Sequence, residues 1–237
     1  MAATSDNAMH PAFEKIRSHH IGTLNLDVEE YRHIKTGARH LHMAADNDEN
    51  VFFVALRTFP MDSTGVAHIL EHTALCGSER FPVRDPFFMM IRRSLNTFMN
   101  AFTSSDWTAY PFASMNRKDF DNLLTVYLDS VFFSSLDPLD FAQEGHRLEF
   151  DTPDDPSTDL VYRGVVYNEM KGAMSAPTSQ LWQNLSSHLF PTTTYHYNSG
   201  GEPDHIVDLS YDDLLRFYRH HYHPSNAIFA TYGDIPA

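Results

Sequence analysis

The chain has 237 residues, of which 42% are apolar and 20% are charged, a composition typical of a globular protein that can bury a sizeable core. Its 17 Lys and Arg residues against 31 Asp and Glu residues give a formal net charge of −14, which argues against a nucleic-acid partner and favours basic or neutral ones such as cationic peptides. The alternative is that the acidic surface serves solubility alone. No apolar run approaches the ~20 residues that would cross a bilayer, so we predict no membrane partner.

The N-terminal segment is polar, and we predict a flexible arm over residues 1–16, followed by a single α/β catalytic domain over residues 17–237. The arm lacks the apolar centre of a signal peptide, and Asp6 and Glu14 argue against an Arg-rich transit peptide. The single cysteine, Cys76, excludes an internal disulfide and fits a reducing compartment. These features predict a cytoplasmic, bacterial-type location, with the mitochondrial matrix or the periplasm as alternatives if a targeting segment is absent.

The first regular elements are predicted to be strands. Residues 21–45 contain a Gly-bearing turn at Thr36-Gly37-Ala38, which indicates two strands joined as a hairpin. Residues 51–59 (VFFVALRTF) are almost continuously apolar, which favours a central strand covered on both faces. Pro60 ends that strand.

A helix is predicted to follow, with Asp62 or Ser63 as its cap and a stop near Gly77. The later elements are a short helix at 86–91, a strand at 107–115, an amphipathic helix from Asn116 to 131, helices at 138–150, 164–174, 181–189 and 212–220, and a last strand at 227–232. Strands and helices that do not alternate strictly predict an α+β fold, with a mixed, largely antiparallel sheet covered on one face by helices.

The segment His68-Ile69-Leu70-Glu71-His72 lies on the predicted helix that follows the apolar strand. Residues four apart stack on one helix face, so His68 and His72 can direct two imidazole nitrogens at one cation. Glu71 lies three residues after His68 and therefore shares that face. There its carboxylate could activate a zinc-bound water as a general base, which is the chemistry of peptide hydrolysis.

A catalytic zinc requires three protein ligands and one open position, so a further donor is needed. Glu169 is the best candidate, because an unpaired carboxylate in its otherwise apolar helix would be costly. An ion pair with Lys171 or a surface position is the alternative for this glutamate. Glu144 and Glu149 are competing donors.

Four runs of the sequence closely resemble the pitrilysin/insulinase family of zinc metallopeptidases, and within it the presequence protease branch. The runs are GVAHILEHTALCGSERFPVRDPF, NAFTSSDWTAYPFAS, QEGHRLEF and GVVYNEMKGAMS. They extend from Gly65 to Ser175, and the ending YHPSNAIFATYGDIPA is also similar, so the resemblance covers nearly all of the chain. It implies the metallopeptidase α/β roll of that family.

The resemblance also implies the site. It makes His68, His72 and Glu169 the ligands of one Zn²⁺ ion per chain, Glu71 the general base, and Glu144 an outer support of the ligands. His146 stands where that motif is expected to have Trp. Family members bind substrate as an added strand. The residues that resemble this strand-binding segment are Asn100, Ala101, Phe102 and Thr103. The residues that resemble the apolar pocket beside the scissile bond are Leu75, Phe87, Phe88 and Ile91.

The family architecture implies two halves that close around unfolded peptides, of which this chain resembles the first unit. We therefore expect a zinc-dependent endopeptidase unit that acts on short unstructured peptides such as cleaved targeting peptides. Its partners would be those peptides and the missing C-terminal half, and the isolated chain would hydrolyse peptides poorly. The alternative is a non-catalytic interaction or scaffold subunit of the same fold.

Overall fold

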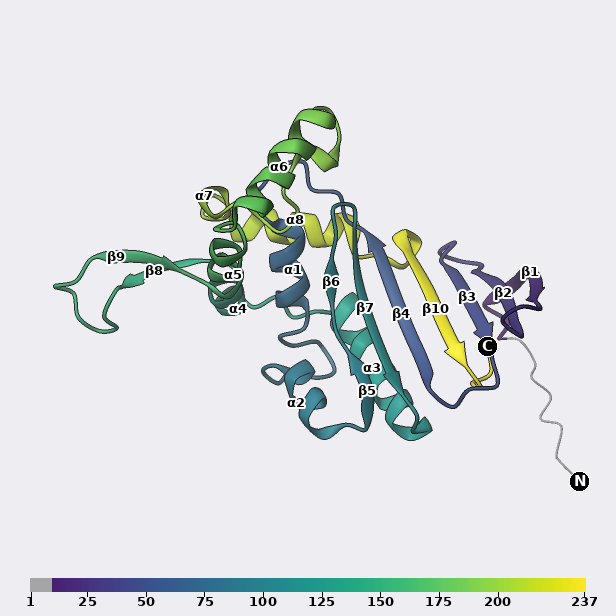
Figure 1. Cartoon of the computed structure of the whole chain (residues 1–237). Helices are drawn as coiled ribbons and strands as arrows, with labels where there is room; N and C mark the ends of the chain where they lie inside the picture. Colours follow the sequence, from purple (N-terminus) through teal and green to yellow (C-terminus); the bar gives the residue numbers. More distant parts are fainter. Residues whose placement is uncertain (1–9) are drawn as a thin grey trace, which may run out of the picture.

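The structure is a computed structural model of the chain, and it describes residues 10–237 (Figure 1). The strands are β1 (Phe13–Ile21), β2 (Leu26–His33), β3 (Arg39–Ala44), β4 (Asn50–Arg57), β5 (Asn96–Met99), β6 (Phe102–Thr103), β7 (Trp107–Ser114), β8 (Arg147–Phe150), β9 (Leu160–Arg163) and β10 (Ala227–Gly233). The helices are α1 (Val66–Ala74), α2 (Pro86–Arg93), α3 (Arg117–Phe132), α4 (Pro138–Glu144), α5 (Val165–Ala173), α6 (Pro177–Leu189), α7 (Pro203–Ile206) and α8 (Tyr211–His221).

One large sheet organises the described part of the chain. Its strands follow the order β1-β2-β3-β10-β4-β7-β5, and β6 pairs with β7 beside β5. The last strand, β10, pairs parallel with β3 and antiparallel with β4, while the other pairings in this sheet are antiparallel. The α+β fold with a mixed, largely antiparallel sheet is therefore confirmed.

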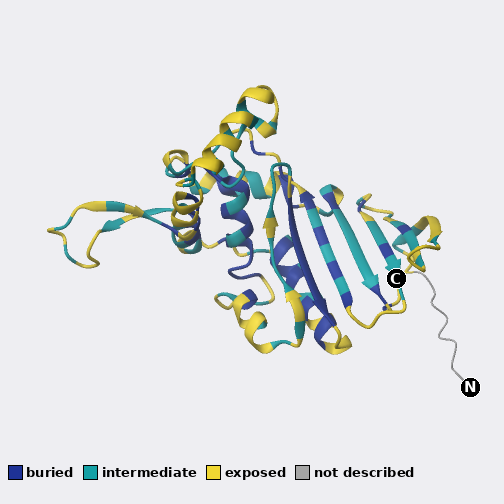
Figure 2. Ribbon diagram, viewed as in Figure 1, coloured by how far each residue is buried: buried dark blue, intermediate teal, exposed yellow. Residues whose placement is uncertain are grey.

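Helices cover one face of this sheet. In β4, Phe52, Val54 and Leu56 are buried, while the residues between them are only partly buried (Figure 2). The predicted burial of this strand on both faces is therefore wrong. Both neighbours of β4 are antiparallel, and antiparallel sheets can be covered on one face only. The apolar residues at the odd-numbered positions of β4 point to the uncovered face. The coverage of a single face by helices agrees with the prediction.

Helix α3 packs on the covered face beside β7. Its cap is Asn116, as predicted, and the Asn116 side chain accepts a hydrogen bond of 3.0 Å from the Asp119 backbone N–H. The ring of Phe112 on β7 lies 5.1 Å from that of Phe120 and 4.9 Å from that of Tyr127, centroid to centroid. Aromatic burial of this kind dominates core energetics, and it fixes α3 against the sheet.

The N-terminal part of the described chain has three strands instead of two. Strand β1 begins at Phe13, so the predicted arm over residues 1–16 extends too far, and residues 1–9 of that arm lie outside the described residues. The predicted turn is present between β2 and β3, where the His33 N–H donates to the Ala38 carbonyl at 2.8 Å and Gly37 adopts a φ of 76°. Exposed polar residues in β1 hid its strand periodicity.

A second, two-stranded sheet projects away from the rest of the molecule (Figure 1). The helix predicted over 138–150 ends at Glu144, and β8 then pairs antiparallel with β9. The hairpin leaves the body at Gly145 and returns at Gly164. A Cβ on Gly164 would overlap the Gly145 carbonyl, so the two backbones touch at the base of the hairpin.

Helices α1, α4 and α5 lie beyond β6, and α8 passes behind the upper ends of β6 and β7 (Figure 1). Strands β5, β6, β8 and β9 and helix α7 were not predicted; each spans two to four residues. Within residues 10–237, no helix has both the length and the apolar character needed to span a membrane.

Candidate metal centre

Helix α1 carries the segment from His68 to His72, and most of its residues are buried. Its core side is anchored by Ile69 and Leu70, which are completely buried. The predicted cap is wrong, because Gly65 occupies the N-cap position with a φ of 71° and makes no side-chain cap bond. The Asp62 carboxylate instead accepts a hydrogen bond of 2.9 Å from the Thr64 N–H.

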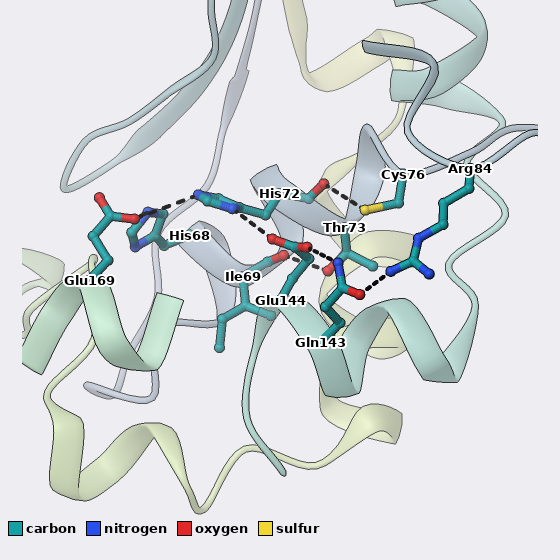
Figure 3. Close-up of polar contacts among 9 residues, drawn as sticks. All are labelled: His68, Ile69, His72, Thr73, Cys76, Arg84, Gln143, Glu144 and Glu169. Atoms are coloured by element: carbon teal, nitrogen blue, oxygen red, sulfur yellow. Dashed lines mark hydrogen bonds and ion pairs between the residues drawn. The ribbon is translucent and has the colours of Figure 1, made fainter. Parts of the chain in front are cut away.

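Three donor atoms from two helices converge beside α1. The Nε2 atoms of His68 and His72 lie 3.7 Å and 3.9 Å from Oε2 of Glu169, which is on α5 (Figure 3). One ligand atom from each residue lies within 4.8 Å of the other two, and no other such group of three or more is present among the described residues. Ligands about 2.0–2.2 Å from a tetrahedral ion lie roughly 3.3–3.6 Å apart, so small side-chain shifts would close this set.

The remaining imidazole nitrogens test whether these residues fit a metal. Nδ1 of His68 lies 3.0 Å from the Gly200 carbonyl oxygen, and Nδ1 of His72 lies 3.1 Å from Oε2 of Glu144. Because both partners are acceptors, each Nδ1 is the nitrogen that carries a proton when the ring is neutral, and each Nε2 is then free to coordinate a cation. A neutral imidazole held in this way is the usual form of a zinc ligand, so the donor set fits the ion.

A chain of hydrogen bonds extends from His72 toward the protein surface (Figure 3). Glu144 accepts from the His72 ring, and its other oxygen accepts a bond of 3.0 Å from the Gln143 amide. Gln143 in turn accepts from the Arg84 guanidinium. Burial raises the pKa of the Glu144 carboxyl, but the bonds from His72 and Gln143 outweigh it and the pKa is lowered overall. Glu144 therefore contacts His72 as an anion.

The His72 imidazole has the opposite balance. Burial lowers its pKa, whereas the bond to Glu144 and the nearby charge of Glu71 raise it, and the net pKa lies above the ordinary value. The ring therefore lies between the carboxylates of Glu144, on the Nδ1 side, and Glu169, on the Nε2 side, and this environment favours a positive charge there.

Glu71 is buried beside the donor set. Burial raises the pKa of its carboxyl, and the hydrogen bond from the Thr103 hydroxyl is the largest of the opposing effects. A carboxylate with a raised pKa is better matched to accept a proton near neutral pH.

The predicted strand-binding segment lies at one edge of the sheet. Asn100 and Ala101 join β5 to β6, and the Asn100 N–H donates to the Pro111 carbonyl of β7 at 3.2 Å. Phe102 and Thr103 form β6 itself. The four residues therefore lie along a single edge of the sheet, and β6, which carries the last two of them, lies beside α1 (Figure 1).

The four residues predicted for the apolar pocket divide into two groups. Leu75 and Phe87 are buried in the core, and the Phe87 ring packs against that of Tyr127. Phe88 and Ile91 are exposed on α2. Only the second pair is accessible to a ligand in this conformation.

The structure distinguishes Glu169 as a donor from the alternatives that the sequence left open, namely Glu149 as the donor and an ion pair between Glu169 and Lys171. Glu149 lies on β8 and pairs with Arg147 at 2.9 Å and Arg163 at 2.7 Å, away from the donor set. The Lys171 ammonium lies over the Tyr167 ring and not at Glu169. Glu169 retains 54% of its side-chain exposure, so the predicted cost of burying its carboxylate is wrong and the alternative of a surface position is confirmed. Solvent reaches the donor set from this side.

Two contacts were missed by the sequence analysis. The Gly200 carbonyl at His68 belongs to the backbone and therefore has no residue signature, although the pair Gly200-Gly201 is a hint of close backbone approach. The Thr103 hydroxyl was predicted to lie near substrate, and its bond to Glu71 was not anticipated.

Comparisons with known proteins place these features in context. The sequence model described as "Insulinase (Peptidase family M16)" matches residues 57–194. A second model, described as "Peptidase M16 inactive domain", matches residues 208–237. The first match includes all three donor residues and Glu71.

Curated relatives share high identity with the chain. "Presequence protease, mitochondrial" of Danio rerio is 58% identical over 213 residues, which cover 90% of this chain and 21% of the relative. The protein of the same name from Mus musculus is 54% identical, with coverages of 90% and 20%. That of Eremothecium gossypii is 50% identical, with coverages of 98% and 23%. The chain thus spans about a fifth of the length of these relatives.

Solved structures share the fold. A structure titled "Crystal Structure of pitrilysin" matches with a TM-score of 0.73 at 16% identity, covering 96% of this chain and 23% of that one. A protease from Helicobacter pylori matches with a TM-score of 0.64 at 20% identity, covering 95% of this chain and 47% of that one. At these identities the likeness concerns the fold alone.

The predicted bacterial-type cytoplasmic location is wrong. Relatives with 50–58% identity are named mitochondrial. The prediction depended on the composition of the first residues, and that composition does not determine a compartment.

Proposed function

The chain belongs to the insulinase family of peptidases, family M16, and on that premise we propose that it is the zinc-binding catalytic unit of a metalloendopeptidase. The observation that supports this most directly is the convergence of the His68 and His72 Nε2 atoms on Glu169 Oε2, with both Nδ1 atoms already engaged. Such a set offers three protein ligands and leaves one position open.

His68, His72 and Glu169 would hold the zinc ion. When bound, zinc would polarise the scissile carbonyl and make water more acidic. The chain's own residues supply the rest. Gly200 and Glu144 hold the two rings in the ligand tautomer, and the buried Glu71 carboxylate takes a proton from water and passes it to the leaving amine.

The proposed substrates are short unstructured peptides of the targeting-peptide class. The relatives are named presequence proteases, which supports this class. An extended peptide would add a strand beside β6, so that backbone pairing provides affinity that tolerates many sequences. Exposed Phe88 and Ile91 on α2 favour large apolar side chains in that peptide.

We propose that the described strands and helices act as one catalytic unit and that the rest of a longer polypeptide completes the enzyme. The relatives are about five times as long as the aligned segment, which supports a contribution from other units. The naming of these relatives as mitochondrial supports a mitochondrial site of action. The second half would supply groups that hold substrate and stabilise the oxyanion.

Glu71→Gln tests the function. The exchange removes the base but keeps the size of a side chain that is no metal ligand, so zinc content should stay at one per chain while hydrolysis by the full-length enzyme collapses. Metal analysis and peptide turnover measure the two effects. Unchanged turnover in a zinc-loaded Glu71→Gln enzyme would refute the assignment of the base.

Metal analysis of the purified wild-type chain separates the proposal from the scaffold alternative. A catalytic unit should retain stoichiometric zinc that a chelator removes. Zinc-edge anomalous scattering should then place one atom about 2.0–2.2 Å from His68, His72 and Glu169. A chain that binds no zinc when supplied with it would favour the scaffold.

A further inference from the structure

We propose that Thr103 is a positioning residue for the general base, and that it links the peptide-binding edge of the sheet to Glu71. This inference rests on the proposed peptidase function. Its basis is the hydrogen bond that the Thr103 hydroxyl donates to Oε2 of Glu71, between β6 and α1.

Strand register determines which way Thr103 points. Thr103 pairs with Thr108 of β7, and Thr108 is completely buried on the covered side of the sheet. The preceding residue, Phe102, pairs with Ala109 and faces the opposite side, where its ring stacks on Phe98. Because side chains alternate along a strand, a peptide that orders β6 also orders the Thr103 side chain toward α1.

Glu71 requires such a partner. It is buried, and a buried carboxylate without a hydrogen-bond donor is costly and free to rotate. Among the described residues, the Thr103 hydroxyl is the donor within hydrogen-bond distance of this carboxylate. One oxygen of Glu71 is thereby fixed, which leaves the other for water.

The edge position makes this contact responsive to substrate. Strand β6 has two residues, and in the described chain it pairs with β7 on one side only. A strand so short is held weakly by its own ladder. A peptide that pairs along its free side would therefore restrain Thr103 and, through it, the carboxylate.

The kinetic test compares Thr103→Val, which removes the hydroxyl at constant size, with Thr103→Ser, which retains it. In the full-length enzyme, Thr103→Val should lower kcat about tenfold or more with KM and zinc content unchanged, and Thr103→Ser should restore most of the loss. Ser104→Ala is the matched control, since it removes a neighbouring hydroxyl and should leave kcat unchanged.

A second measurement does not depend on activity. In the metal-free 237-residue chain, Thr103→Val should lower Tm by about 2–4 °C, and this shift should disappear when Glu71 is replaced by Leu. A shift of equal size in both backgrounds would show that the hydroxyl does not act on Glu71, and would overturn the inference.

Three results with Thr103→Val would also overturn the inference. Two are kinetic, namely an unchanged kcat in the zinc-loaded variant and a change in KM alone. The third is a loss of zinc that accounts for the loss of rate. If the wild-type enzyme shows no zinc-dependent hydrolysis, the proposed function is wrong, and the comparison of Tm values still decides whether Thr103 is coupled to Glu71.

Discussion

His68 Nδ1 lies 3.0 Å from the carbonyl oxygen of Gly200, 132 positions further along the chain. The contact depends on close backbone approach, because a Cβ on Gly65, at the start of α1, would lie 2.8 Å from that same oxygen. The first ligand is therefore oriented by a loop that no side-chain motif identifies. This relationship is open to a direct test.

Gly65→Ala should lower both the stability and the zinc affinity of the chain. The new methyl group meets the Gly200 oxygen, and the φ of 71° at this position adds about 1–3 kcal/mol of backbone strain. Gly37→Ala is the control, because Gly37 has a similar φ of 76° but nothing within 4 Å of its Cβ position. Zinc titration and urea unfolding measure the two effects. Equal zinc affinities in the two variants would contradict the role assigned to Gly200.

Glu144→Ala should weaken zinc binding by about 10–100-fold, because the His72 ring loses the acceptor that fixes its orientation. Glu149→Ala removes a carboxylate five residues away that pairs with two arginines on the hairpin, and it should leave zinc affinity unchanged. Competition with a chromophoric chelator measures both. A Glu149→Ala variant that loses zinc as readily as Glu144→Ala would reject this distinction.

Zinc should raise the thermal stability of the chain. At a free zinc concentration 100 times the Kd, binding to the folded state contributes about 2.7 kcal/mol, which corresponds to a rise in Tm of about 5–10 °C. A chelator should reverse the rise, and His68→Ala should abolish it. His223→Ala, at an exposed position, should retain it. A zinc-induced shift that persists in His68→Ala would place the ion elsewhere.

Stability should also fall in mild acid for a reason unrelated to the metal centre. Burial lowers the pKa of His40 from about 6.5 to about 4, helped by the charge of His42, and the ring bonds to Thr231 Oγ1 at 2.8 Å. The unfolded chain therefore binds a proton between these values while the folded chain does not. The stability present above pH 6.5 is lost as the pH falls toward 4, by about 3 kcal/mol at most.

His40→Gln should reduce this dependence on pH, because its side chain cannot be protonated. His19→Gln, on the exposed strand β1, is the control and should preserve it. Urea midpoints at pH 7 and pH 5 give the comparison. Identical pH dependence in the wild type and His40→Gln would assign the acid effect to other groups.

The sequence predicted the part of the site that is local in the chain. His68, Glu71 and His72 share a face because helical periodicity brings residues three and four apart together, and this relation needs no tertiary information. The approach of Glu169 is not local. The residues alone left Lys171, Glu144 and Glu149 as alternatives, and only the family resemblance selected among them.

The missed elements share a physical cause. Strands β5 and β6 are too short to show alternation, and their pairing with β7 is decided by tertiary contacts. The helix predicted over 138–150 is too long, because the backbone leaves the helical conformation at Gly145 and β8 begins two residues later. The burial of β4 was overestimated because an apolar run does not reveal whether its second face is covered.

The contact between Gly145 and Gly164 has a consequence for how the chain can vary. Glu144 and Glu169 stand on the two sides of the β8–β9 hairpin, and the touching glycines close its base, so the distance between these carboxylates does not depend on what lies between them. The segment that joins β8 to β9, residues 151–159, can therefore be lengthened, shortened or tagged as a surface loop, whereas His146 at the base contacts the Leu209 carbonyl at 2.9 Å. Homologous chains should tolerate insertions there far better than any exchange at the two glycines.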